Sequence, residues 1–154
     1  TYGTCVGGAI VRGGAVYHGA NWSAGEFGMM YMNGEYYENI ASVTRLVEQA
    51  KAMDASLCDG RTITANLDRS DVHVLVDGWA KQVAEGLASL MHIFNPACII
   101  IGGGIMEDEN VFNMVTSKVS ELTAPGFDVN IRSARFGNSA GLIGAGILAQ
   151  KLMK

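Results

Sequence analysis

The sequence is poor in cysteine and in long apolar runs, and each shortage excludes a class of protein. Its 154 residues include 3 cysteines, and Cys5, Cys58 and Cys98 stand far apart without a Cys-x-x-Cys pair. That spacing supports neither a disulfide framework nor a zinc knuckle, and it is typical of a reducing cytosol. No apolar run approaches the roughly 18 residues that a membrane-spanning helix needs.

The charge is also low. Charged residues make up 17% of the chain and the formal net charge is -4, with the 11 lysines and arginines scattered singly. Nucleic-acid binders need clustered basic side chains, so this composition argues against a phosphate-backbone partner for this segment. Apolar residues reach 49%, which is enough for one domain with a substantial core.

The first part of the chain predicts a hairpin and two helices. Residues 4–17 suit two strands around a Gly-Gly turn, because glycines supply the positive φ angles of a tight turn. Apolar residues at helical spacing follow over 41–53 and, most strongly, from Val72 to Phe94. The polar residues 59–70 between these helices are expected to form a surface loop.

The second part predicts strands alternating with helices. Asn95-Pro96 ends the long helix, since proline disfavours the α region in the residue before it. Cys98–Ile101 is a continuous apolar run that suits a strand buried on both faces. With a helix over 109–122, a strand over 129–134 and a helix over 141–152, the pattern predicts an α/β or α+β domain whose mixed sheet is flanked by helices.

Two glycine-rich segments could hold a nucleotide. In Gly3-Thr4-Cys5-Val6-Gly7-Gly8, glycines let backbone amides approach an anion and Thr4 adds a hydroxyl donor, which suits a phosphate. No Lys-Ser/Thr follows and no helix follows, so this is neither a Walker A loop nor a dinucleotide fingerprint. Gly102, Gly103 and Gly104 leave a bare backbone after a buried strand, where adenine or ribose could rest. The alternatives are a glycine-rich hairpin without ligand and a tight strand-to-helix connection.

Two acidic residues could bind a sugar. Glu26 lies in the small-residue loop of residues 19–28, and Glu38 follows shortly after it. A carboxylate suits vicinal hydroxyls because each of its oxygens accepts a separate, charge-assisted hydrogen bond. The alternative is that both are ordinary solvated surface residues.

Taken in order, these segments resemble the ROK family (repressors, open reading frames and sugar kinases). The similar stretches are GTCVGGAIVRGG, GANWSAGEFG, YYENIAS, NPACIIIGGGI and AGLIGAGILA, and together they cover essentially the whole chain. The resemblance implies an actin-like, RNase H-like ATPase fold. Residues 1–154 would be the C-terminal, large domain that binds nucleotide and sugar, and the N-terminal lobe would be absent.

The resemblance also implies roles for single residues. The family's second phosphate motif matches Gly3, Thr4, Gly7 and Gly8, and its adenosine motif matches Gly102, Gly103 and Gly104. Its sugar-contacting glutamates match Glu26 and Glu38, while Asn21 lies in the adjacent loop, where it contacts sugar or shapes the turn.

The chain departs from the family at its zinc site. Met29 stands where most members have a histidine that meets the sugar and ligates zinc, and the cysteine cluster that completes that site is replaced by residues 32–37. A thioether is a poor zinc ligand beside thiolate and imidazole, so no structural zinc is predicted. One sugar contact is then lost as well, which favours an amino sugar or a glycoside over glucose.

The family reaction is transfer of the ATP γ-phosphoryl group to a sugar hydroxyl, with Mg²⁺ on the phosphates. In the family the catalytic base is an Asp of the N-terminal lobe, so the isolated chain is expected to bind but not to catalyse. The alternative function is the sugar-sensing domain of a ROK-type transcriptional repressor, with nucleic acid as a partner only through an upstream DNA-binding domain. A cytoplasmic homodimer is the expected form.

Overall fold

A single long helix, α4 (Ser70–Phe94), organises the structure, a computed structural model that describes residues 1–153. Its apolar residues recur every three or four positions, so one side of the helix is buried along almost its whole length. The helix ends at Asn95, which adopts a left-handed conformation with φ of 41° just before Pro96. The predicted helix and its end are therefore confirmed.

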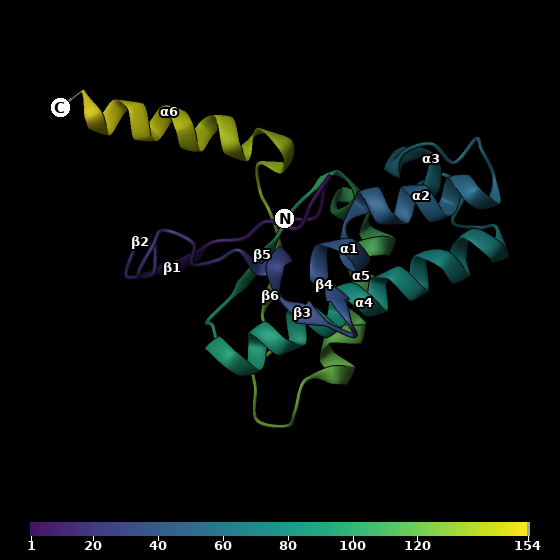
Figure 1. Cartoon of the computed structure of the whole chain (residues 1–154), viewed down its shortest axis with the longest axis horizontal. Helices are drawn as coiled ribbons and strands as arrows, with labels where there is room; N and C mark the ends of the chain where they lie inside the picture. Colours follow the sequence, from purple (N-terminus) through teal and green to yellow (C-terminus); the bar gives the residue numbers. More distant parts are fainter. Residues whose placement is uncertain (154) are drawn as a thin grey trace.

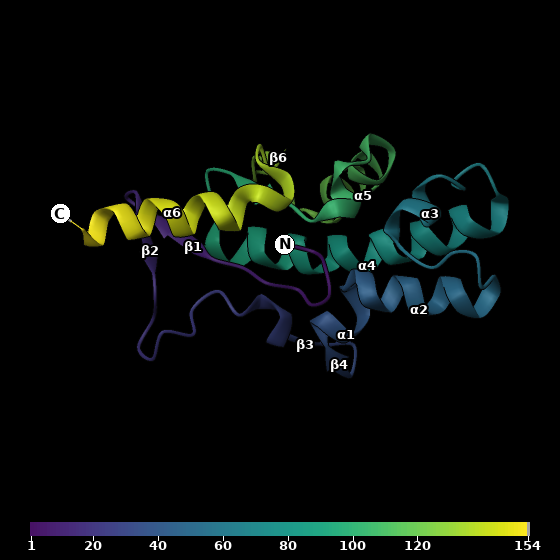
Figure 2. The ribbon, with the colours of Figure 1, turned by 90° about the horizontal axis from the view of Figure 1, so that it is seen from above.

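Shorter helices lie beside α4 (Figures 1 and 2); α1, α2 and α5 pack against it, whereas α3 packs against α2. They are α1 (Tyr37–Ala41), α2 (Val43–Met53), α3 (Gly60–Thr64) and α5 (Glu109–Leu122). The segment predicted as one helix over 41–53 is broken at Ser42, whose hydroxyl accepts from the Arg45 amide at 3.3 Å and caps α2. None of the helices in residues 1–153 has the length and apolar character needed to cross a bilayer.

The strands form three two-stranded sheets in the described residues. Antiparallel pairs are β1 (Ile10–Arg12) with β2 (Ala15–Tyr17), and β3 (Tyr31–Met32) with β4 (Glu35–Tyr36); the parallel pair is β5 (Ile99–Ile101) with β6 (Ile131–Ser133). The first hairpin turns at two glycines with φ of 60° and 78°, as predicted, although its first strand begins at Ile10 instead of residue 4. The expected mixed sheet is thus present as separate pairs.

The remaining elements of residues 1–153 are three 3-10 turns and a last helix: η1 (Phe27–Met29), η2 (Gly104–Glu107), η3 (Gly137–Ser139) and α6 (Ala140–Leu152). Helix α6 lies apart from the helices around α4 in Figure 1, and its main contact is with η3. Large apolar side chains on it lie open to solvent, with Leu142 80% and Leu148 62% exposed.

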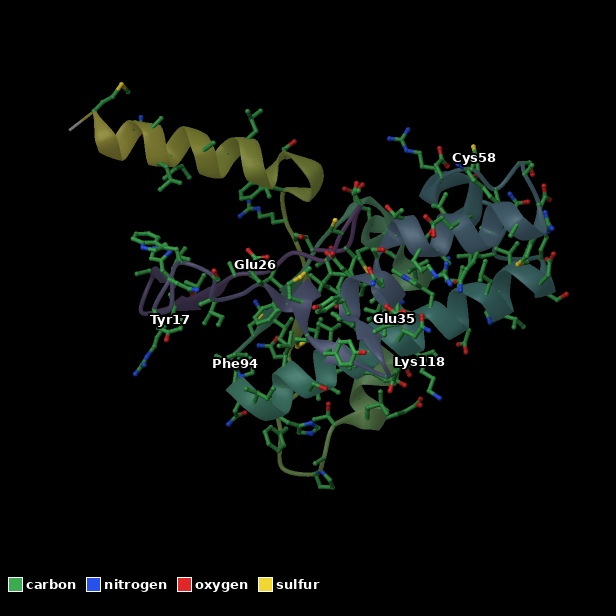
Figure 3. All side chains as sticks on the ribbon, in the orientation of Figure 1. Tyr17, Glu26, Glu35, Cys58, Phe94 and Lys118 are labelled. Atoms are coloured by element: carbon green, nitrogen blue, oxygen red, sulfur yellow. The ribbon has the colours of Figure 1, made fainter. Side chains whose placement is uncertain are left out.

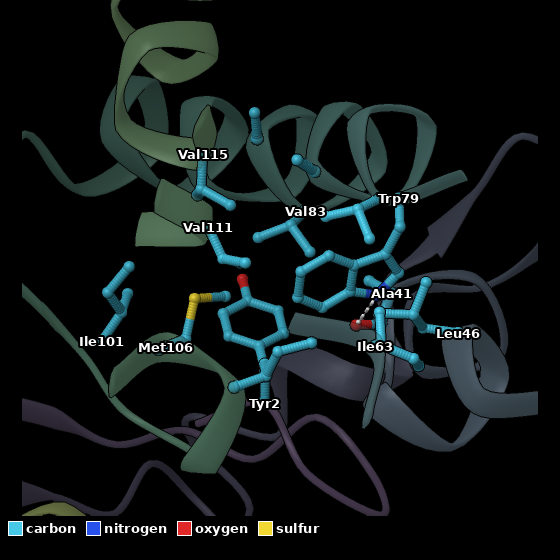
Figure 4. Packing of buried hydrophobic residues seen from close by; sticks show 14 of the residues in the cluster. Tyr2, Ala41, Leu46, Ile63, Trp79, Val83, Ile101, Met106, Val111 and Val115 are labelled. Carbon is cyan, nitrogen blue, oxygen red and sulfur yellow. Dashed lines mark hydrogen bonds between the residues drawn. The ribbon is translucent and has the colours of Figure 1, made fainter. Parts of the chain in front are cut away.

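Aromatic side chains tie the N-terminus to α4 in the core (Figure 4). The Trp79 indole donates to the Ala41 carbonyl at 3.1 Å. The Tyr37 hydroxyl donates to the Val83 carbonyl at 2.7 Å and lies 2.8 Å from the Tyr2 hydroxyl, which therefore donates to it. Both hydroxyls are buried and satisfied, so this network fixes where the chain enters the core.

Two expectations from the sequence are wrong. The polar segment 59–70 is not all loop, because it contains α3, which an Asp59–Thr62 capping box starts and which buries Ile63 completely. The apolar strand after α4 is not buried on both faces, because Ile101 is 2% exposed while Ile100 is 67% exposed.

Candidate nucleotide and sugar site

The two glycine-rich segments predicted to hold nucleotide meet at one pocket. A cavity of about 450 Å³ is lined by Gly3, Thr4 and Gly7 from the first segment and by Gly103 from the second. The two segments are nearly a hundred residues apart in the sequence, so only the tertiary structure brings them together.

Close backbone contact explains why the second segment needs glycine. The Tyr2 amide donates to the Gly102 carbonyl at 2.8 Å. Gly103 has φ of 118°, and a Cβ there would collide with the Tyr2 carbonyl. Any side chain at this position would therefore push the two segments apart.

The pocket presents backbone donors suited to an anion. Among the hydrogen bonds of the described residues, none uses the amides of Thr4 or Cys5, and the Thr4 side chain is exposed. The first turn of α6 adds Ala140 and Gly141 to the lining. A helix N-terminus carries unpaired N–H groups and a positive dipole end, so all of these groups favour a phosphate.

Gly137, Ala140 and Gly141 were not recognised as site residues from the sequence. Gly137 has φ of 45°, and a Cβ there would collide with the Glu107 carboxylate, so the chain turns tightly between β6 and α6. A glycine after a strand, followed by small residues at the start of a helix, is a signal that could have found this wall of the pocket.

Three of the predicted nucleotide glycines lie outside this pocket. Gly8 packs against the loop that carries Glu26, because a Cβ at Gly8 would meet the Phe27 ring and the Gly25 carbonyl. Gly102 is buried, and a Cβ built on it would lie 3.0 Å from the Cβ of Ala134. Gly104 is the first residue of η2. These three glycines therefore shape the loops around the pocket but do not line it.

The two predicted sugar residues lie near each other around Gly28. Glu26 is exposed just before η1, on the segment that follows β2 (Figure 3). A Cβ at Gly28 would lie 3.0 Å from Glu38 Oε2 and would collide with the Val6 carbonyl. Glu38 therefore lies against the turn that Glu26 begins, and Gly28 in that turn also approaches the Val6 carbonyl.

Asn21 is not brought against this pair by any contact of the described residues. It lies in the exposed turn of the same loop, where its carbonyl accepts from the Ser23 hydroxyl at 3.4 Å. The neighbouring Trp22 has φ of 66° and its ring lies 4.2 Å from that of His18. The turn is thus held by its own contacts.

The methionines of the segment in which the sequence predicts a lost zinc site divide between core and surface. Met30 and Met32 pack against the hydrophobic core, whereas Met29 is 48% exposed beside Gly28. In residues 1–153 no group of three or more His, Cys, Asp or Glu side chains is placed to hold a metal ion.

Burial shifts the ionisation of the tyrosines below the pocket. Desolvation raises the pKa of Tyr2, although its hydrogen bond with Tyr37 opposes the shift. Desolvation and the neighbouring Tyr2 raise the pKa of Tyr37. Both hydroxyls therefore stay protonated in the folded chain at neutral pH and act as structural donors.

A family model described as the ROK family matches residues 1–152. The chain belongs to the ROK family. It is 31% identical to a β-glucoside kinase from Listeria innocua. That alignment of 159 residues covers 94% of this chain and 53% of the relative. A ROK hexokinase from Thermus thermophilus has a TM-score of 0.82 and 27% identity, over 94% of this chain and 53% of that one.

A ROK family transcriptional regulator homologous to the Escherichia coli MLC protein shares the fold, with a TM-score of 0.80 at 21% identity over 97% of this chain and 44% of that one. The predicted actin-like ATPase fold is confirmed. This ROK chain spans about half the length of the relatives it matches.

Proposed function

We propose that this ROK chain is the large, nucleotide- and sugar-binding domain of an ATP-dependent sugar kinase. The observation that carries the proposal is the meeting of Gly3, Thr4 and Gly7 with Gly103 at one pocket of about 450 Å³. Glu38 of α1 lies beside Gly28, which follows Glu26 by two residues in the sequence. The nucleotide phosphates would thus bind at the glycine-lined pocket, and the sugar beside the loop of Glu26.

In this arrangement the chain supplies positioning and electrostatics. The free amides of Thr4 and Cys5 and the start of α6 would hold the phosphates of ATP, while the two glutamates accept from sugar hydroxyls. No carboxylate lines the described pocket, so Mg²⁺ would reach the site on the phosphates and neutralise their charge there. The base that orients the attacking hydroxyl would come from the half of the protein outside this chain.

A glycoside or amino sugar suits the site better than free glucose. Met29 has no donor and only a weak thioether acceptor where the family has a histidine, so one hydroxyl of the sugar is left without that partner. The similarity to a β-glucoside kinase supports this choice. Met30 and Met32 fill space against the core, which supports a site that needs no structural zinc.

The domain assignment has a further support. Helix α6 exposes Leu142 and Leu148, as expected of a helix that another part of the protein covers.

The proposed homodimer and location rest on other residues. The pair Tyr31 and Tyr36, exposed by 71% and 49%, is available for a homodimer contact. The free cysteines fit the proposed cytosolic location.

The test is a kinase assay on the full-length protein with ATP, glucose, amino sugars and β-glucosides. We expect phosphorylation of at least one of these sugars, and none by the isolated chain. In full-length protein Glu38→Gln should lower kcat/KM for the sugar by about 10- to 100-fold with an unchanged KM for ATP, since it weakens a charge-assisted bond. Thr4→Ala should raise the KM for ATP instead.

Glu35→Gln is the matched control, because Glu35 is a nearby exposed carboxylate whose partner is Asn39. It should leave both kinetic constants unchanged. If the full-length protein phosphorylates none of these sugars and instead binds DNA in a sugar-dependent manner, the repressor alternative replaces the kinase proposal.

A further inference from the structure

An exposed pair of aromatic side chains lies on the loop that carries Glu26. The Trp22 indole is 77% exposed, and its ring centroid lies 4.2 Å from that of His18, with the two ring planes tilted by 38°. His18 therefore covers part of one face of the indole and leaves the rest open to solvent. Single exposed apolar residues are common on protein surfaces, so a binding role for this pair needs further support.

The backbone of Trp22 gives the first support. Its φ is 66°, in the left-handed region, where a bulky side chain is an outlier and glycine is favoured. The indole stays mostly exposed, so burial in the core does not compensate for this conformation. Backbone outliers of this kind cluster at sites that clamp a ligand.

The turn that carries Trp22 is closed at its base, which gives the indole a defined place. The Ala24 amide donates to the His18 carbonyl at 3.1 Å, and a Cβ on Gly19 would lie 3.0 Å from the Ala24 methyl. Glu26, labelled in Figure 3, follows two residues after this closure. Four residues of chain span at most about 14 Å, so the Cα atoms of Trp22 and Glu26 lie within that distance.

The surroundings of Trp22 suit a neutral ligand with hydroxyl groups. Residues 13–25 contain no Asp, Glu, Lys or Arg, so this surface has no side chain that would pair with a phosphate or a nucleic acid. In the part of the chain that the structure describes, the Asn21 carboxamide and the Trp22 indole N–H make no hydrogen bond. A carboxamide both donates and accepts, so it can meet a hydroxyl in either role.

We propose that Trp22 and Asn21 bind the second ring of a β-glycoside. Its first ring lies against Glu26 and Glu38 in the function proposed above, on which this inference rests. The face of an aromatic ring is negative, and the C–H bonds on the flat face of a β-linked pyranose carry partial positive charge, so the two faces stack. Because the two carboxylates take the first ring, the indole four residues before Glu26 is available for the group beyond the glycosidic bond.

Kinetics of the full-length protein with two β-glucosides test the inference. Cellobiose carries a second glucose ring, whereas methyl β-glucoside ends at a methyl group. Trp22→Gly should raise the ratio of the KM for cellobiose to the KM for methyl β-glucoside by about tenfold, the equivalent of one aromatic stacking contact. Glycine suits a φ of 66°, so this variant keeps the loop, and Trp22→Phe should restore part of the loss. Asn21→Ala should raise the same ratio by about fivefold, the equivalent of one neutral hydrogen bond.

Tyr17→Ala is the matched control, because Tyr17 is an exposed aromatic residue at the end of β2, next to the same loop. It should leave the ratio unchanged. An equal rise of both KM values in Trp22→Gly would show that Trp22 only shapes the loop of Glu26, and it would overturn the inference.

Quenching of indole fluorescence by acrylamide gives a measurement that needs no catalysis. Trp79 is 1% exposed, so Trp22 is the accessible tryptophan of residues 1–153. In full-length protein the difference between wild type and Trp22→Phe isolates the Trp22 signal. Without ATP, cellobiose should protect Trp22 from quenching, and methyl β-glucoside should not.

The outcomes separate this inference from the kinase proposal. If the protein phosphorylates sugars but cellobiose leaves Trp22 unprotected, the inference fails and the kinase proposal stands. If cellobiose protects Trp22 and no sugar is phosphorylated, the kinase proposal fails and the site for the second ring stands. Trp22 that is already inaccessible in the protein without sugar would be covered by another part of the protein or by a second copy, and protection by ATP alone would make it a nucleotide contact. Either result overturns the inference.

Discussion

Replacing Gly86 by alanine tests how the aromatic network under the candidate nucleotide pocket is held. Gly86 lies on the buried side of α4, and a Cβ there would collide with the Tyr37 ring. That ring would have to move away from α4. The movement would break the bond from Tyr37 to Val83 and the bond that Tyr37 accepts from Tyr2.

The expected loss of stability is large for a single methyl group. Overpacking of a core costs about 1–3 kcal/mol, and each lost buried hydrogen bond costs about 1 kcal/mol. Alanine is favoured over glycine in a helix by about 1 kcal/mol, which offsets part of this. Gly86→Ala should therefore lower the free energy of unfolding by about 2–4 kcal/mol.

The assay is equilibrium unfolding in urea, followed by the helical circular dichroism signal. With a urea dependence of about 2 kcal/mol per M, the midpoint should fall by about 1–2 M. Gly78→Ala is the matched control, because Gly78 lies in the same helix and has no atom within 4 Å of a built Cβ. It should raise the stability by about 0.5–1 kcal/mol.

A variant with a smaller side chain at position 37 separates the clash from helix propensity. In a Tyr37→Val background the ring is gone, so adding Gly86→Ala should cost little or should stabilise the chain. If Gly86→Ala alone is as stable as Gly78→Ala, the close approach of Tyr37 to α4 is refuted, together with its part in positioning Tyr2.

Three further predictions concern the pocket and its surroundings. Gly103→Ala should lower the free energy of unfolding in urea by about 3 kcal/mol or more, because its Cβ would collide with the Tyr2 carbonyl and its φ is 118°. The control is Gly126→Ala, where φ is 96° and a built Cβ meets no atom within 4 Å, and it should cost about 1 kcal/mol. Equal losses in the two variants would contradict the collision. Burial raises the pKa of Tyr2 and Tyr37 above the ordinary 10.0, so their ionisation favours the unfolded state. The free energy of unfolding should therefore be constant below about pH 10 and fall above it, and the fall should be less steep in Tyr37→Phe. Urea unfolding measured between about pH 8 and 11 would test this. Elemental analysis of the full-length protein should find no stoichiometric zinc, since Met29 replaces the histidine ligand, and one zinc per chain would contradict this.

The sequence by itself predicted the elements whose signals are local. The apolar spacing from Val72 to Phe94 needs only one buried face, and the Gly13-Gly14 turn needs only two positive φ angles. The ordered motifs also identified the family, because each motif is a short stretch that can be compared without knowing its neighbours in space.

Segments whose structure depends on distant partners were harder to predict. Helix α3 lies in a polar stretch, and it forms because Asp59 and Thr62 cap it and Ile63 enters the core. The exposure of Ile100 could not be foreseen from an apolar run, because exposure depends on which neighbouring strand covers the edge.

The tertiary structure alone decided which glycines act together. The sequence treated Gly7 and Gly8 alike, yet Gly7 lines the candidate nucleotide pocket while Gly8 makes room for the loop of Glu26. It also passed over Gly137, which closes the pocket from the far end of the chain. The physical reason is that a glycine's role depends on what a Cβ would meet, and that neighbour can lie a hundred residues away, as the Tyr2 carbonyl does for Gly103.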